Sequence, residues 1–136
     1  MPTAHPTPIL NTSLPLHFRQ IRLELAREPG HPDGDGDVAY VILAPLDAEG
    51  RINPVLWKEN RDACRVTRLR SDEDDQHGLL VHRPGGAWAF HYEAASRLVD
   101  DVGYHFSDER FVAGEYVSIN EDGKMHTYRV TSVARL

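Results

Sequence analysis

The dipeptide Asp122-Gly123 constrains the fold of this chain more than any other feature of its sequence. Asp-Gly is a preferred centre for a two-residue β-turn, and apolar residues alternate with polar ones on both sides of it. In a two-residue hairpin Val117 opposes Tyr128 and Ile119 opposes His126, which gives one consistent inner face. The C-terminal segment is therefore predicted to be a β-hairpin, with His126 in a structural position at the end of its core face.

Strand patterns also occur earlier in the chain. Residues 21–25 alternate apolar and charged side chains, which favours a half-buried strand, although the helix formers in 21–27 leave a short helix as the alternative. The β-branched run 38–43 is typical of a central strand. Asp47 to Gly50 predicts a type I turn with a glycine bulge. A return strand is then expected over 52–57.

A second hairpin is predicted over residues 79–92, turning at Gly85-Gly86. With Arg83 opposite Trp88, alternation sends one set of side chains to the core, namely Leu79, Val81, Trp88, Phe90 and Tyr92. The same alternation sends Leu80, His82, Ala89 and His91 to the opposite face. His82 and His91 are therefore expected to lie near each other on adjacent strands.

These segments predict an all-β protein, a small antiparallel barrel or sandwich of about seven or eight strands. Turn signals recur at short spacing, and only residues 93–102 suggest a short helix or helical turn, which Gly103 can end. A barrel is favoured over a sandwich because closure leaves no unpaired sheet edge. The four prolines of residues 1–15 indicate a flexible arm, and 16–136 are expected to form a single β domain.

Composition narrows the choice of partners and compartment. The net charge of −6 disfavours binding to a nucleic-acid backbone, and no apolar run is long enough to cross a bilayer. The first residues lack the basic and apolar stretches of a signal peptide, and the single cysteine allows no internal disulfide. We therefore expect a cytoplasmic protein that binds a small molecule or a protein partner, with no membrane association.

A metal-dependent enzyme is an alternative, because the chain has eight histidines. If His82 and His91 share a face, a third ligand, His105 or else Glu93 or Asp108, would complete a site with an open coordination position for a transition metal. No His-x-His or His-Glu-x-x-His spacing accompanies these residues. The metal site is therefore kept as an alternative and not as the leading expectation.

The leading expectation is a binding module without catalytic activity. No Gly-x-Ser-x-Gly motif or phosphate-binding loop occurs in the sequence. The ligand-binding candidates are the aromatic and cationic residues Trp57, Arg68, Trp88 and Tyr92. A third alternative is anion or RNA binding through the arginine-rich strand of residues 61–70, where arginines and nearby aromatic rings could hold an anion or stack on a base.

Overall fold

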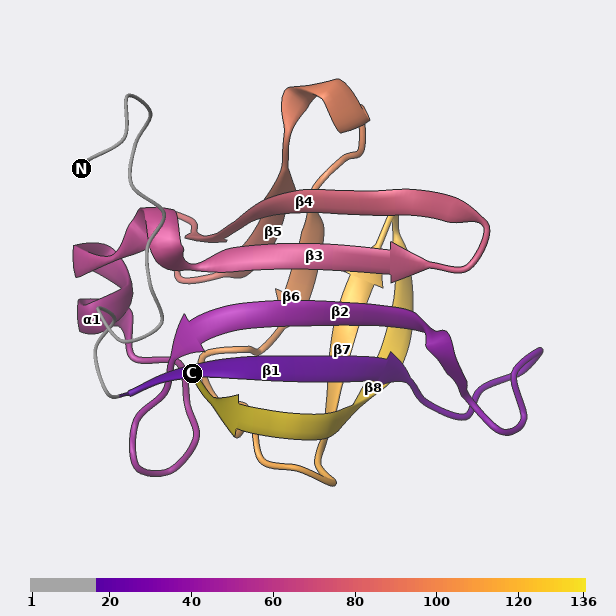
Figure 1. Cartoon of the computed structure of the whole chain (residues 1–136), viewed down its shortest axis with the longest axis horizontal. Helices are drawn as coiled ribbons and strands as arrows, with labels where there is room; N and C mark the ends of the chain where they lie inside the picture. Colours follow the sequence, from indigo (N-terminus) through magenta and orange to yellow (C-terminus); the bar gives the residue numbers. More distant parts are fainter. Residues whose placement is uncertain (1–16) are drawn as a thin grey trace, which may run out of the picture.

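The structure is a computed structural model that describes residues 17–136. Within these residues eight strands form a closed barrel, in which each strand pairs antiparallel with the next and the last pairs with the first (Figure 1). The strands are β1 (Phe18–Leu25), β2 (Asp35–Pro45), β3 (Arg65–Arg70), β4 (Glu73–His82), β5 (Trp88–Tyr92), β6 (Asp101–Tyr104), β7 (Tyr116–Glu121) and β8 (Lys124–Arg135). The predicted all-β fold is confirmed as a barrel. The arm expected at 1–15 lies outside the described residues.

The C-terminal hairpin has the predicted register. Glu121 pairs with Lys124 across the turn, Val117 pairs with Tyr128, and Ile119 pairs with His126. The two turn residues Asp122 and Gly123 have φ values of 51° and 84°, the left-handed conformations that a type I′ turn requires. The alternation in residues 21–25 also gives a strand, β1, and not a helix.

The return strand expected over 52–57 is wrong. The glycine-bulge turn before it forms as predicted, because the Asp47 amide donates to the Arg51 carbonyl at 2.8 Å. Ile52, however, makes only an isolated bridge, and the chain then enters helix α1 (Pro54–Glu59). The Asn53 side chain accepts hydrogen bonds from two amides of the first turn. Asparagine as N-cap and proline at the first helical position are strong helix-start signals, so they override the strand-like composition.

The segment 93–102 forms the shorter of the two expected structures, a helical turn. It forms one 3₁₀ turn, Ala94–Ser96, and its last residues already belong to β6. A second 3₁₀ turn, Arg61–Ala63, follows α1. The strands β5 and β6 pair at only two positions, Ala89 with Val102 and Phe90 with Asp101, whereas every other neighbouring pair of strands has at least three. The β5–β6 junction is therefore the least extensively paired part of the barrel.

The hairpin between β4 and β5 differs from the prediction by one residue on β4. Arg83 pairs with Ala87 around a three-residue loop, so His82, and not Arg83, lies opposite Trp88. Trp88, Phe90 and Tyr92 face the core as predicted. On β4 the faces are exchanged, since Leu80 is fully buried and His82 stacks on the Trp88 ring with centroids 4.0 Å apart. The predicted core positions Leu79 and Val81 consequently face outward and are only partly buried.

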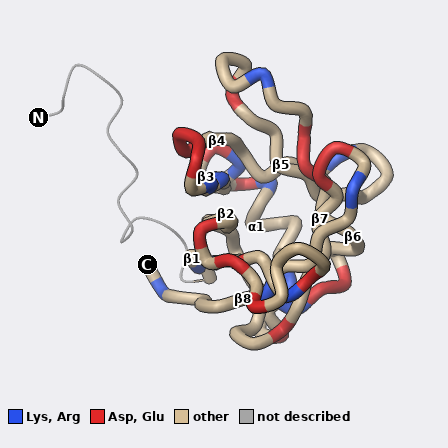
Figure 2. The backbone as a smooth tube through the Cα atoms, turned by 90° about the vertical axis from the view of Figure 1, so that its right-hand side faces the viewer, with Lys and Arg blue, Asp and Glu red and all other residues tan. Residues whose placement is uncertain are grey.

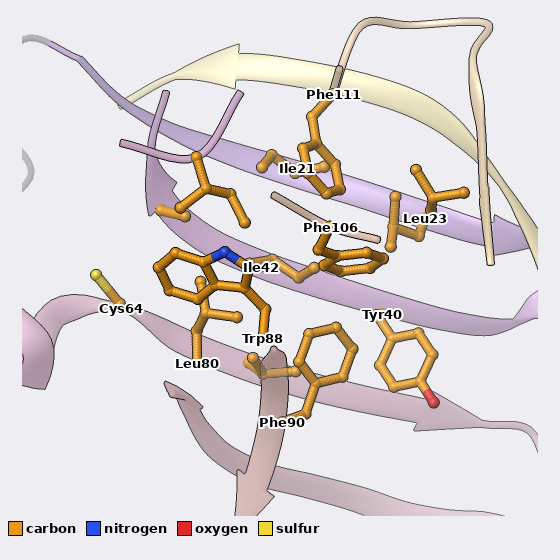
Figure 3. Close-up of a cluster of buried hydrophobic side chains, with 14 of the residues drawn as sticks. Ile21, Leu23, Tyr40, Ile42, Cys64, Leu80, Trp88, Phe90, Phe106 and Phe111 are labelled. Atoms are coloured by element: carbon orange, nitrogen blue, oxygen red, sulfur yellow. The ribbon is translucent and has the colours of Figure 1, made fainter. Parts of the chain in front are cut away.

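Side chains fill the barrel interior, and the two ends of the barrel differ. Helix α1 lies at one end, and the turn between β3 and β4 lies at the other (Figure 1). Buried aromatic rings occupy the middle, including Phe106 and Phe111 from the segment between β6 and β7 (Figure 3). Cys64 is also fully buried, and burial raises the pKa of its thiol to about 12, as expected for a core cysteine. Among residues 17–136, no helix has the length and apolar character needed to span a bilayer.

Candidate functional site

A groove of about 640 Å³ crosses the outer surface of β3, β4 and β5 and is bounded by the first residues after β5. Strand pairing places its outward side chains in two rows. One row contains Arg65, Leu79 and His91, and the other contains Thr67, His77 and Glu93. This surface, called the outer groove below, combines a cation, an anion, two imidazoles, a hydroxyl and an apolar side chain.

His91 is held in a fixed orientation at one end of the outer groove. Its Nδ1 lies 2.8 Å from Asp100 Oδ1, and the other carboxylate oxygen of Asp100 accepts a hydrogen bond from Arg83. Burial would raise the pKa of Asp100, but the hydrogen bonds and charges of Arg83 and His91 outweigh it and hold the pKa below its ordinary value. Because an ionised carboxylate only accepts hydrogen bonds, Nδ1 of His91 carries a proton, and in the neutral form of the ring the other nitrogen, Nε2, carries none. Nε2 is then left as an acceptor on a ring that is 65% exposed.

A second group of polar side chains lies inside the barrel, at the end opposite α1. The Tyr40 hydroxyl oxygen is 2.8 Å from Asp101 Oδ2 and 2.7 Å from Glu121 Oε2. The hydroxyl of Tyr92 also donates to Asp101, and that of Tyr128 donates to Glu121. Arg70 contributes a guanidinium group 3.3 Å from Glu121 Oε1. These six residues are called the lumen cluster below. They come from β2, β3, β5, β6, β7 and β8.

The lumen cluster is closed to ligands in this conformation. Tyr40 and Tyr128 are fully buried, and Asp101 is 6% exposed. Figure 3 shows the Tyr40 ring packed in the hydrophobic core, with its hydroxyl pointing away from the other rings. Burial raises the pKa of the three phenols, so each hydroxyl keeps its proton at neutral pH. The lumen cluster is thus a buried hydrogen-bonded network, whereas the outer groove is open to solvent.

The four predicted ligand-binding residues do not form one site. Tyr92 lines the outer groove and also belongs to the lumen cluster. Trp57 and Trp88 are buried against each other with ring centroids 5.3 Å apart, and the Trp57 Nε1–H donates to the Leu80 carbonyl. Arg68 faces inward and pairs with Glu73 at 2.9 Å. Of the four, only Tyr92 is therefore part of the groove.

The basic segment 61–70 is largely paired with acidic groups and carbonyls of the same chain. Figure 2 shows the basic residues of β3 beside the acidic turn into β4. Arg68 binds Glu73, Arg70 binds Glu121, and Arg65 Nε donates to the Asp62 carbonyl. Of these three arginines, only Arg65 lines the outer groove.

The predicted metal ligands are separated in the structure. The one-residue change in the β4–β5 register turns His82 inward and leaves His91 outside, so the expectation that they share a face is wrong. His105 lies at a different depression, next to Gly86 and Tyr104. Within the described part of the chain, no three His, Cys, Asp or Glu side chains are grouped so that they could hold a metal ion.

Sequence reasoning overlooked most of the lumen cluster, although a signal for it was present. Glu121 has the same parity as Val117 and Ile119, and so the confirmed register turns its carboxylate inward next to Tyr128. An acidic residue in phase with a core face has to find a buried partner. The partners Tyr40 and Asp101 come from distant parts of the sequence, and only the closed barrel brings them together.

Comparison with protein-family models, with curated proteins and with solved structures found no match to this chain. The function inferred below therefore rests on the geometry of the outer groove.

Proposed function

We propose that the protein is a binding module that holds a small hydroxylated organic acid in the outer groove. One observation carries this proposal: Asp100 orients His91 at the end of a row of outward side chains that begins with Arg65. The concave shape and the volume of about 640 Å³ favour a small molecule over a protein partner. Of the arginines in the segment 61–70, Arg65 is the one that we propose to bind the anionic group of the ligand.

The chemistry of the row defines the ligand. The Arg65 guanidinium suits a carboxylate, because its donors match two carboxylate oxygens. The His91 Nε2, as an acceptor, suits a hydroxyl group at the far end of the ligand. Leu79 lies between them and provides an apolar contact for the ligand body. Since Arg65 and His91 are two strands apart, their backbones are separated by about 10 Å, which a substituted phenyl ring can span with help from the side chains.

The test is an NMR titration with para-hydroxyphenylacetate. We expect saturable shifts at residues of the outer groove, and none at Tyr40 and Tyr128, which lie inside the barrel and outside the groove. Phenylacetate lacks the hydroxyl, and para-hydroxyphenylacetamide lacks the carboxylate; each should bind about tenfold more weakly, because one hydrogen-bonding group loses its partner. Absence of saturable shifts with all three compounds, or equal affinity for all three, would contradict the proposal.

A pair of histidine variants separates the groove from the rest of the surface. H91A should weaken binding of para-hydroxyphenylacetate about tenfold, through loss of the oriented acceptor. H105A is the matched control, because His105 is also an exposed histidine near an aspartate but lies outside the outer groove. Its affinity should equal that of the unaltered protein. Equal affinities of H91A and H105A would show that His91 does not bind the ligand.

A further inference from the structure

The lumen cluster contains more close oxygen–oxygen contacts than its hydroxyl groups have protons. Four close oxygen contacts connect the cluster: Tyr92 with Asp101, Tyr40 with Asp101, Tyr40 with Glu121, and Tyr128 with Glu121. Two oxygens at hydrogen-bonding distance need a proton between them, since two lone pairs repel each other. Three phenols supply three protons. The fourth contact therefore requires a proton on a carboxyl group.

The position of the missing proton follows from the role of Tyr40. Tyr92 and Tyr128 each touch one carboxylate and can donate to it. Tyr40 touches two carboxyl groups with a single proton, so it donates to one and accepts from the other. Either Asp101 or Glu121 is consequently protonated, and its proton points at the Tyr40 oxygen.

The surroundings of the two carboxyl groups identify Asp101 as the protonated one. The Arg70 guanidinium lies 3.3 Å from Glu121 Oε1, so the permanent positive charge beside these two carboxyl groups is next to Glu121 and compensates a carboxylate there. Asp101 is more deeply buried, and Arg68, the arginine whose charge acts on it, is paired with Glu73. Burial raises the pKa of Asp101, and the charge of Glu121 adds to the rise, whereas hydrogen bonds from Tyr92 and Tyr40 and the charge of Arg68 oppose it.

We propose that Asp101 is a proton-binding site in the native protein, and that its bound proton keeps the β5–β6 junction closed. Asp101 lies in this junction, opposite Phe90, where only two residue pairs connect the strands. The hydroxyl of Tyr92 on β5 reaches Asp101 inside the barrel, next to the outer bond between His91 and Asp100. Side-chain hydrogen bonds on both faces thus support a junction that has few backbone pairs.

The groups that surround this proton come from six strands and one loop. They are Tyr40 on β2, Arg68 and Arg70 on β3, Glu73 on β4, Tyr92 on β5, Glu121 on β7, Tyr128 and His126 on β8, and Glu28 in the loop after β1. The inward residues of β1 in the core, such as Leu23 and Leu25, are apolar. Arg70 and His126 both lie next to Glu121, and the charge of Arg70 offsets one negative charge in the lumen.

Loss of the proton would weaken the junction. Two carboxylates would then face the single proton of Tyr40 in a medium of low dielectric constant, and like charges there repel strongly. Separation of β5 from β6 would relieve the repulsion, and it would disrupt fewer strand pairings than separation of any other two neighbouring strands. Raising the pH through the pKa of Asp101 should therefore open the barrel at this junction.

The experiment begins with the unaltered full chain. The side-chain carboxyl carbons are followed by ¹³C NMR as the pH is raised, and Asp101 should titrate well above the ordinary aspartate pKa of about 3.9, with Glu121 remaining ionised. Amide hydrogen exchange in β5 and β6 should increase as Asp101 ionises, beyond the intrinsic effect of pH on exchange. Titration of Asp101 at or below the ordinary value, or a protonated Glu121 in its place, would overturn the proposal.

Two neighbouring variants separate proton binding from general weakening of the junction. D101N cannot ionise, and its side-chain amide can still donate to Tyr40, so the pH-dependent part of the exchange in β5 and β6 should disappear. D100N removes the charge of Asp100 and one of the two oxygens that accept from His91 and Arg83, and it should raise exchange while the Asp101 titration is retained. If D101N keeps the pH-dependent exchange of the unaltered protein, Asp101 does not control the junction.

Discussion

Tyr40 is the residue on which the interior polar network depends. Its ring packs against Phe90 and Tyr128 with centroid distances of 5.0 and 5.1 Å, and its hydroxyl connects the buried carboxyl group of Asp101 with the partly buried one of Glu121. The apolar run 38–43 predicted a central strand correctly, but the sequence around Tyr40 gave no sign of this polar role. A tyrosine fits both requirements, since its ring is apolar and its hydroxyl needs a partner when buried.

Replacement of the Tyr40 hydroxyl should destabilise the fold. In Y40F, the buried Asp101 and the partly buried Glu121 lose the oxygen between them, and we expect the free energy of unfolding to fall by about 1–3 kcal/mol. Urea unfolding at neutral pH measures it. The control is Y104F, because Tyr104 is half exposed and lies outside the lumen cluster, and its stability should change by less than about 0.5 kcal/mol. Equal effects of Y40F and Y104F would contradict the role of the hydroxyl.

At the scale of the strand pair, Gly78 allows β4 and β5 to approach closely. A Cβ atom at Gly78 would lie 2.4 Å from the backbone carbonyl oxygen of His91, a distance that backbone atoms cannot relieve without moving the strand. Gly78 pairs with Tyr92, and both residues line the outer groove. The glycine therefore determines the shape of the groove as well as the contact between the strands.

G78A should be strongly destabilising. We expect a loss of about 3 kcal/mol or more in the free energy of unfolding, because the clash is with backbone and not with a flexible side chain. G36A provides a control, since a Cβ atom there would come no closer than 3.3 Å to the flexible Glu24 carboxylate. Chemical denaturation of both variants tests the difference. A G78A protein as stable as G36A would show that the strands can separate without cost.

The two hairpins show how far local sequence determines an element. Asp122-Gly123 has one favoured geometry, so its loop length, register and inner face could all be predicted. Gly85-Gly86 is compatible with several loop lengths, and the three-residue loop found here exchanges the faces of β4. This one-residue difference in register places His82 and His91 on opposite faces of the sheet. Asp100, which orients His91, was not predicted because it lies beyond β5 in an irregular segment.

For the whole molecule, two adjacent aspartates give the stability opposite dependences on pH. The pKa of Asp101 is raised in the native state, so its contribution is fully present below about pH 4 and is lost as the pH rises through the native pKa. The pKa of Asp100 is lowered, so its contribution is present above about pH 4 and is lost as the pH falls through the native pKa. The barrel as a whole therefore loses stability at higher pH through Asp101 and at lower pH through Asp100.

Each limb of the stability profile should respond to one variant. D101N should flatten the decrease on the alkaline side, and D100N should flatten the decrease on the acid side, as measured by urea unfolding from about pH 3 to pH 9. The exposed aspartate variant D108N is the control and should leave both limbs in place. An alkaline limb that is unchanged in D101N would contradict the assignment of the raised pKa to Asp101.

The consecutive positions of Asp100 and Asp101 have a consequence for binding at the groove. One aspartate holds a residue of the outer groove, the other belongs to the lumen cluster, and their partners His91 and Tyr92 are themselves consecutive on β5. A ligand that prefers the closed junction must then strengthen proton binding inside the barrel, and the proton must strengthen ligand binding by the same factor. Association of such a ligand would then be accompanied by uptake of protons from the buffer, and its affinity would increase as the pH falls through the native pKa of Asp101.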